Sequence, residues 1–244
     1  MTLISDQQVE QFKEQGFFVT GPMWGQDELQ PVRDEFNRLH AEALAAVEMS
    51  GDAEKVDRVR YRPFIGEAHT RSDVLMTFVK SPIYLEASAR LVGSDADLRY
   101  NQVVIKPPKK GRHFGWHQDS GYRVTEPLLF ITCWTAITHS FVENGCIWII
   151  PGSHKLGLID HVRNEADAST DAVMDDEEGA IPVEMQPGQV AIFSSLMLHK
   201  SGPNTSNEPR FAYVPHYCVP GVIDVSNGQL FGDQFPVLRN GRPV

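Results

Sequence analysis

The sequence has little cysteine. Cys133, Cys146 and Cys218 are its three thiols, and they lie far apart. An odd number of dispersed cysteines argues against a disulfide framework, and none of them has the close-paired spacing of a zinc ribbon. We therefore expect reduced, packed thiols in a cytoplasmic protein.

Long apolar runs are also missing. No stretch approaches the roughly 20 apolar residues that a membrane-spanning helix needs. Residues 1–6 lead directly into an amphipathic pattern without the basic and apolar regions of a signal peptide, which again favours a cytoplasmic location.

Basic charge is scarce relative to acidic charge. The chain has 22 Lys and Arg against 32 Asp and Glu, a formal net charge of −10, and its basic residues are scattered. Electrostatics therefore gives no reason to expect nucleic acid or an anionic membrane as a partner. We expect a small-molecule substrate and a monomer or homodimer.

The composition is that of one globular domain. The chain has 244 residues, of which 41% are hydrophobic and 22% charged, enough to bury one large core. It contains no internal repeat and no low-complexity linker. We therefore treat 1–244 as a single domain.

Residues 1–97 are predicted to be mostly helical. Ser5 and Gln8 form a capping-box signature, and apolar residues then recur at the 3.6-residue period that places them on one helix face. The helices expected from these patterns cover about 6–15, 27–50, 72–79 and 82–92, with a brief strand at 17–19 after Gly16.

From residue 98 the pattern changes to short β-rich runs separated by Gly, Pro or Asn. The expected strands cover about 100–105, 128–137, 146–150, 181–185, 190–194 and 210–218. Because no helix of βαβ length separates them, they predict an antiparallel sandwich or jelly roll with the N-terminal helices against one sheet. The expected core is 98–218, and 219–244 is expected to be a C-terminal tail.

Residues 155–180 break this pattern. The stretch is long, weakly patterned and acidic at Asp175-Asp176-Glu177-Glu178. Connections of this length are usually functional or disordered. We interpret it as a lid over a site or as a solvated loop.

The first chemical signal is His117-Gln118-Asp119, inside the aromatic segment Phe114–Ser120. In extended backbone, side chains two positions apart point to the same face. His117 and Asp119 could therefore bind one metal ion while Gln118 points away.

His199 is the candidate third ligand. It follows the predicted strand at 190–194, and Gly202-Pro203 turns the chain directly afterwards. Two imidazoles and one carboxylate on one face leave three open positions on an octahedral ion, the arrangement of non-haem Fe(II) oxygenases. The same three ligands could also serve a zinc-dependent hydrolase.

Arg210 favours the oxygenase. It lies eleven residues after His199 on the next predicted strand, and a guanidinium beside an iron site can bind the remote carboxylate of a dicarboxylate in a bidentate manner. Ser201 could donate a further hydrogen bond to the same group. An ordinary ion pair of Arg210 with Glu208 or Asp224 is the alternative.

These motifs together resemble the phytanoyl-CoA dioxygenase (PhyH) family of Fe(II)- and 2-oxoglutarate-dependent oxygenases. The resemblance covers roughly 98–217. It rests on His117-Gln118-Asp119, Trp134, the run Asn144–Lys155, and Leu198–Asn204 with Arg210.

The resemblance implies a double-stranded β-helix, a jelly-roll, cupin-like core, with Fe(II) held by His117, Asp119 and His199. It implies that 2-oxoglutarate chelates the iron at its keto-acid end and meets Arg210 and Ser201 at the other. Gln102 and Trp134 are further candidates for contact with 2-oxoglutarate.

The implied activity uses O2 to hydroxylate, desaturate or rearrange a small organic molecule while 2-oxoglutarate is decarboxylated to succinate and CO2. Related halogenases carry a small residue at the carboxylate position, so Asp119 implies that this chain does not halogenate. A zinc-dependent hydrolase and a non-catalytic cupin-like binding protein are the alternatives.

Contacts to the substrate are less defined. Lys106, Arg112, His113, Tyr122 and Arg123 flank the metal motif and offer polar groups, but solvated loops explain them equally well. The acidic chain shows no basic groove for the phosphates of a CoA thioester, so we favour a free small molecule. We expect the remaining histidines, His161 and His216 among them, to be surface or hydrogen-bonded residues.

Overall fold

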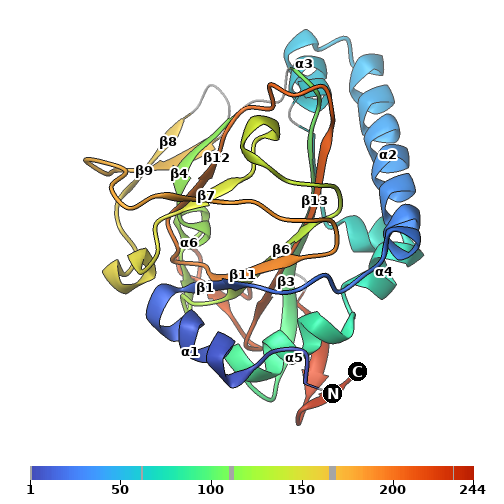
Figure 1. Cartoon of the computed structure of the whole chain (residues 1–244). Helices are drawn as coiled ribbons and strands as arrows, with labels where there is room; N and C mark the ends of the chain where they lie inside the picture. Colours follow the sequence, from blue (N-terminus) through green and yellow to red (C-terminus); the bar gives the residue numbers. More distant parts are fainter. Residues whose placement is uncertain (1, 62, 110–112, 165–168, 233) are drawn as a thin grey trace.

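The computed structural model describes residues 2–61, 63–109, 113–164, 169–232 and 234–244 (Figure 1). Its helices are α1 (Asp6–Gln15), α2 (Gln26–Met49), α3 (Ala53–Tyr61), α4 (Asp73–Phe78), α5 (Pro82–Leu91) and α6 (Asp119–Tyr122). Its longer strands, of four residues or more, are β3 (Ala96–Lys106), β4 (Phe114–His117), β6 (Ile131–Ala136), β8 (His161–Asn164), β9 (Ser169–Ala172), β11 (Val190–Ser194), β13 (Arg210–Cys218) and β15 (Phe235–Arg239). Its shorter strands are β1 (Phe17–Val19), β2 (Phe64–Gly66), β5 (Thr125–Glu126), β7 (Ile147–Ile149), β10 (Ile181–Val183), β12 (His199–Ser201), β14 (Ile223–Asp224) and β16 (Arg242–Pro243).

Two antiparallel sheets form the centre of the fold. The larger has the strand order β1-β11-β6-β13-β3-β15-β16, with β2 also paired to β3, and the smaller has the order β10-β7-β12-β4. Their facing sides share one apolar cluster, in which Trp134 and Phe193 from the larger sheet meet Ile147 and Ile149 from the smaller. This is the predicted jelly-roll, double-stranded β-helix core with flanking helices.

The N-terminal helices cover the outer side of the larger sheet (Figure 1). Leu29, Val32, Phe36 and Leu39 recur on one face of α2 and are fully buried against that sheet. The sheet is therefore covered on both sides, and β6, β11 and β13 are buried at every position. In β13, Ala212 lies with the cluster between the sheets. Tyr213, its neighbour, lies with the helices.

Most predicted elements are confirmed. Ser5 caps α1 with the expected capping box, and Gly16 ends it at φ 83°, a left-handed conformation that glycine adopts without strain. The predicted strands at 17–19, 190–194 and 210–218 coincide with β1, β11 and β13. Helix α3 was not predicted, because most of its residues are polar and none of them is buried.

Two segments differ from expectation. Residues 155–180 contain a hairpin, β8 with β9, in addition to loop. The core does not end at residue 218 as expected. Within the expected tail at 219–244, β15 joins the larger sheet beside β3 and buries Val237 and Leu238. Only four residues, Phe235 to Leu238, carry its apolar pattern, and one of them is proline. This local signal is too weak to predict a strand that long-range pairing stabilises.

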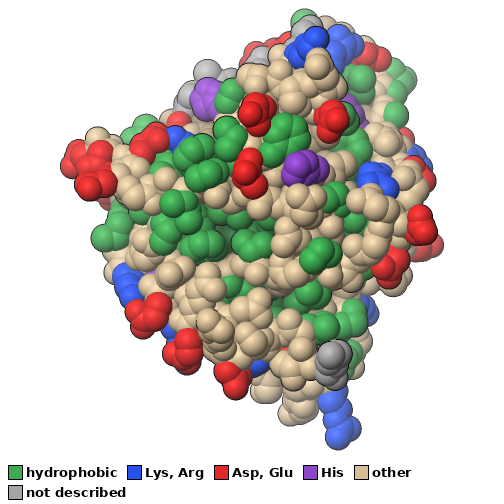
Figure 2. Space-filling view, viewed as in Figure 1, with side chains coloured by type: hydrophobic (Ala, Val, Ile, Leu, Met, Phe, Trp, Pro, Cys, Tyr) green, Lys and Arg blue, Asp and Glu red, His purple; other side chains and the backbone are tan. Residues whose placement is uncertain are grey.

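The surface agrees with the composition. Figure 2 shows acidic side chains spread around one face, while hydrophobic side chains gather about a hollow near its centre. Within the described ranges, no helix is long and apolar enough to cross a membrane.

Candidate active site

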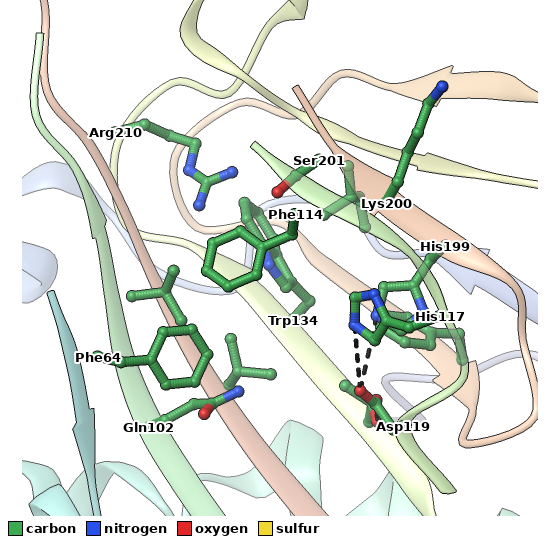
Figure 3. Close-up of a pocket in the computed structure, with 15 residues that line it drawn as sticks. Phe64, Gln102, Phe114, His117, Asp119, Trp134, His199, Lys200, Ser201 and Arg210 are labelled. Carbon is green, nitrogen blue, oxygen red and sulfur yellow. Dashed lines mark hydrogen bonds and ion pairs between the residues drawn. The ribbon is translucent and has the colours of Figure 1, made fainter. Parts of the chain in front are cut away.

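Three predicted ligands meet where the small sheet joins α6. His199 on β12 is the direct antiparallel partner of His117 on β4, so the two imidazoles lie side by side. Asp119 begins α6, one residue beyond the extended Gln118. Its Oδ1 lies 3.9 Å from His117 Nε2 and 3.6 Å from His199 Nε2 (Figure 3). One donor atom of each residue lies within 4.8 Å of the others.

Backbone carbonyls orient both imidazoles. His117 Nδ1 lies 2.8 Å from the carbonyl oxygen of Gly115, and His199 Nδ1 lies 2.9 Å from that of Met197. An Nδ1–H that donates to a carbonyl leaves the Nε2 lone pair free for a metal ion. Both Nε2 atoms face Asp119, so the two rings present the correct atom to a shared ion.

Asp119 is held in a similar way. The hydroxyl of Thr132, on β6 of the other sheet, donates to Asp119 Oδ2 over 2.5 Å, which leaves Oδ1 toward the histidines. Gln118 points away as expected, and its buried amide donates to the carbonyls of Gly157 and Leu196. This anchoring fixes the turn from which Asp119 projects.

The protonation states suit a metal ion. Burial and the neighbouring His199 lower the pKa of His117 to about 3. Burial alone would raise the pKa of Asp119, but His199, His216, His117 and the Thr132 hydrogen bond together lower it below its ordinary value. Near neutrality His117 is therefore uncharged and Asp119 ionised, the forms in which these residues bind metals.

All seven predicted site residues line one pocket: His117, Asp119, His199, Ser201, Arg210, Gln102 and Trp134. Arg210 lies at the far side of this pocket from Asp119, beside Ser201 (Figure 3). Its guanidinium lies 5.1 Å from the Trp134 ring centroid, measured from Cζ. The larger sheet thus supplies Gln102, Trp134 and Arg210, and the smaller supplies His117, His199 and Ser201.

Arg210 is buried without an anionic partner. Only 1% of it is exposed, Nη1 donates to the carbonyl of Gly145, and Nε has no hydrogen-bond partner. Among the described residues it forms no ion pair, so the alternative pairing with Glu208 or Asp224 is absent. Burial lowers the pKa of Arg210 to about 9, which still leaves it cationic near neutrality.

A second cavity of about 430 Å³ lies beside the same metal ligands. It is lined by Arg58, Phe64, Arg99, Tyr100, Gln102, Phe114, His117, Asp119, Tyr122, Arg123, Phe130, His216 and Phe231. Tyr122 and Arg123, the predicted flanking residues, are among them. Of the others, Lys106 is buried and bonded to the carbonyl of Ser201, His113 is exposed, and Arg112 lies outside the described residues.

Sequence reasoning missed Arg99 and His216. Arg99 lies just before the strand expected at 100–105, which the structure extends to 96–106, and His216 was expected to be a surface or hydrogen-bonded histidine. The charge of Arg99 within the β-rich run 96–106 was the available signal, since a fully buried strand seldom carries an unpaired arginine.

Known proteins similar to this chain agree with the metal chemistry that the pocket suggests. The family model described as "Phytanoyl-CoA dioxygenase (PhyH)" matches residues 12–212. A probable phytanoyl-CoA dioxygenase of Caenorhabditis elegans is 30% identical over 59% of this chain and 50% of its own length. A phytanoyl-CoA dioxygenase domain-containing protein of Mus musculus is 31% identical over 62% of this chain and 55% of its own length. The matches thus span about half the length of these relatives.

Solved structures share the fold. A non-heme monooxygenase, ThoJ, is 26% identical with a TM-score of 0.71 over 89% of this chain and 79% of its own. EvdO2 from Micromonospora carbonacea var. aurantiaca, solved with 2-oxoglutarate, is 20% identical with a TM-score of 0.72 over 93% of this chain and 95% of its own. At 20% identity, the second match supports the fold alone.

Proposed function

Because the chain belongs to the phytanoyl-CoA dioxygenase family, we propose that it is an Fe(II)- and 2-oxoglutarate-dependent dioxygenase that hydroxylates a small organic molecule. Desaturation or rearrangement would use the same machinery. One observation carries the proposal: the His117, Asp119 and His199 cluster shares a pocket with the buried, unpaired cation Arg210.

Fe(II) would be held by His117 Nε2, His199 Nε2 and Asp119 Oδ1. Two neutral imidazoles and one carboxylate match the donor set of non-haem Fe(II) sites, and all three side chains are held by hydrogen bonds before any ion binds. The residues therefore fit the ion without rearrangement of their donors.

2-Oxoglutarate would pair with Arg210 through the carboxylate remote from the metal. A buried guanidinium with a free Nε is stabilised by an anion that reaches it, because an uncompensated charge is costly in a sheltered site. Ser201 would add a hydrogen bond, and Gln102 and Trp134 would line the remaining surface.

When bound, Fe(II) and 2-oxoglutarate supply the oxidising chemistry, in which O2 is consumed and 2-oxoglutarate becomes succinate and CO2. The residues of the chain hold and orient the reactants and shelter the site from water. The carboxylate of Asp119 supports hydroxylation over halogenation, since it occupies the position that a halide would need.

We further propose a cytoplasmic location and a monomer or homodimer. The three cysteines are buried and unpaired, which supports a reducing compartment.

Anaerobic titration of the Fe(II)-loaded protein with 2-oxoglutarate tests the proposal. We expect a weak visible charge-transfer absorption, and in air a substrate-stimulated release of succinate. Asp119→Ala should abolish both, whereas Asp34→Ala, which removes an exposed carboxylate on α2, should abolish neither. If the unaltered protein shows no such absorption but hydrolyses esters with Zn²⁺, it is a hydrolase instead.

A further inference from the structure

The second cavity and the pocket of Arg210 adjoin each other at the metal ligands. They share Phe64, Gln102, Phe114, His117 and Asp119 and otherwise have different walls. Arg210 pairs with Lys106 at one end of β3, whereas Arg99 lies seven residues away at the other end, roughly 24 Å along the strand. The two arginines therefore serve separate compartments.

A β-bulge turns Arg99 into the cavity. Tyr100 pairs with His216 and Leu98 pairs with Tyr217, so Arg99 is an extra residue on β3 at that point. Regular alternation would place Arg99 on the helix side, where Leu98 lies instead. The bulge brings Arg99 and Tyr100 to the cavity side together.

Arg99 has no anionic partner in the protein. It is 7% exposed, its Nη1 is enclosed without a hydrogen-bond partner, and it forms no hydrogen bond or ion pair with any described residue. Its Cζ lies 4.4 Å from the ring centroid of Phe130 and 3.9 Å from that of Phe231. These rings hold the guanidinium in place but do not neutralise its charge.

The nearby carboxylates are already engaged. Asp224 pairs with Arg123 over 3.1 Å and accepts hydrogen bonds from Ser226. Asp119 accepts from Thr132 and faces the two histidines. Both carboxylates favour the charge of Arg99 through space, but neither forms a hydrogen bond or ion pair with it. A directly bound anion for Arg99 must therefore enter from outside.

His216 adds a second unsatisfied polar atom to the same wall. Its ring stacks on Phe130 with centroids 5.2 Å apart, and its buried Nε2 has no hydrogen-bond partner. Arg99 and His216, from adjacent strands, thus both line this cavity, and each carries a buried polar atom without a hydrogen-bond partner.

The rest of the cavity wall is largely aromatic. Phe64, Phe114, Tyr122, Phe130 and Phe231 line it, and its volume of about 430 Å³ is in the range of small-ligand sites. An apolar body of modest size would be buried against these rings. Arg58 and Arg123 complete the wall, and Arg123 already pairs with Asp224. The volume suits a compact ligand better than a long group such as the nucleotide of coenzyme A.

We infer that this cavity binds a small organic acid, whose carboxylate pairs with Arg99 and whose apolar body lies against the phenyl rings beside the metal ligands. This inference rests on the proposed function and names the class of its substrate. The guanidinium of Arg99 would bind the carboxylate through two parallel hydrogen bonds, and His216 would hydrogen-bond to a polar group of the same molecule.

Anaerobic calorimetry on the Fe(II)- and 2-oxoglutarate-loaded protein tests this. The probes are 3-phenylpropanoate, octanoate and their neutral amides. We expect at least one acid to bind about tenfold or more tightly than its amide, and Arg99→Met to remove that preference by weakening the acid alone. Arg99→Lys, which keeps the charge but loses the fork, should weaken acid binding less than Arg99→Met. Arg33→Met, which removes a guanidinium on α2 outside the cavity lining, should retain the preference for the acid.

Three outcomes would overturn the inference: neither acid binds, acid and amide bind alike, or 3-phenylpropanoyl-CoA binds more tightly than the free acid. Persistence of the acid preference in both Arg99 variants would also overturn it. In all of these cases the charge-transfer absorption with 2-oxoglutarate would remain. Loss of that absorption in the unaltered protein would instead contradict the proposed function.

Discussion

Thr132 illustrates how one side chain can set the strength of a metal site that it does not contact. Its hydroxyl donates a hydrogen bond to Asp119 Oδ2, which leaves Oδ1 directed toward His117 and His199. The threonine comes from the larger sheet and the histidines from the smaller, so this hydrogen bond also joins the two sheets at the site.

We expect Thr132→Val, which preserves the side-chain volume, to weaken Fe(II) binding by about 10- to 100-fold while the fold persists. Titration with Fe(II) under anaerobic conditions measures the change. Thr135→Val is the control. It also removes a buried hydroxyl from the same strand, but this hydroxyl bonds to Tyr84 and not to Asp119. Equal Fe(II) affinity in both variants would mean that Thr132 does not orient Asp119.

Arg210 permits a separate prediction about 2-oxoglutarate. Arg210→Met should raise the 2-oxoglutarate concentration for half-maximal charge-transfer absorption by about 30-fold or more, because a buried charge-assisted pair is lost. Fe(II) affinity should stay nearly constant, since Arg210 holds none of the proposed donors. A change in Fe(II) affinity alone would mean that Arg210 supports the fold and does not anchor 2-oxoglutarate.

Part of this site was predictable from residue order. Side chains two positions apart in extended backbone share a face, so His117 and Asp119 were expected to lie together. Arg99 was not predictable, because its direction depends on a bulge whose cause is the register between β3 and β13. His216 was missed for a related reason: its burial depends on Phe130, far away in sequence.

The hairpin formed by β8 and β9 supports the metal motif from outside the sheets. His161 on β8 accepts a hydrogen bond from the backbone N–H of Gln118 over 3.1 Å, and its Nδ1 lies 2.9 Å from the carbonyl of Ile159. Gly121 lies under this ring, where a Cβ would come within 2.4 Å of His161 Nε2. The close approach of α6 to the hairpin thus requires glycine.

Gly121→Ala should lower the free energy of unfolding by about 1–3 kcal/mol, because the added methyl group must displace the His161 ring. Urea denaturation measures this. The double variant with His161→Ala should lose less than the sum of the two single losses, since the clash is absent there. Gly21→Ala, where no atom lies within 4 Å of the added Cβ, is the matched control.

The two strands of this hairpin lie within 155–180, where the sequence analysis predicted no strand. Its strands are only four residues each and its residues are mostly polar, so neither alternation nor length marked them. That the segment acts as a lid stays a prediction. Deleting residues 174–178, which leaves β8 and β9 in place, should then alter substrate turnover more than Fe(II) binding, whereas unchanged turnover would identify an ordinary connection.

The molecule as a whole should lose stability in mild acid when it is free of metal. Burial lowers the pKa of His216 to about 4, below the ordinary 6.5 of an unfolded histidine. Between pH 6.5 and pH 4 the unfolded chain therefore binds more protons than the folded chain, and the free energy of unfolding falls as pH falls. His117 adds to this effect because its pKa is also lowered.

The loss due to His216 should reach roughly 3 kcal/mol by pH 4. Urea denaturation at pH 7, 5.5 and 4.5 should show a smaller decline for His216→Gln than for the unaltered protein. His113→Gln, which changes an exposed histidine, should decline like the unaltered protein. Parallel declines in all three proteins would show that His216 is not kept neutral by the fold.

Residue order alone indicated the helical first third, the antiparallel core and the pairing of His117 with Asp119, because helix periodicity, strand alternation and two-residue ligand spacing act over a few residues. His199, far away in sequence, was a candidate through its place after a predicted strand and through the family resemblance. Packing between the two sheets decided the rest. It left Arg210 and Arg99 as buried cations in separate compartments, and it added β15 to the larger sheet. Such features depend on strands that pair across a hundred residues or more, and no local pattern specifies their register.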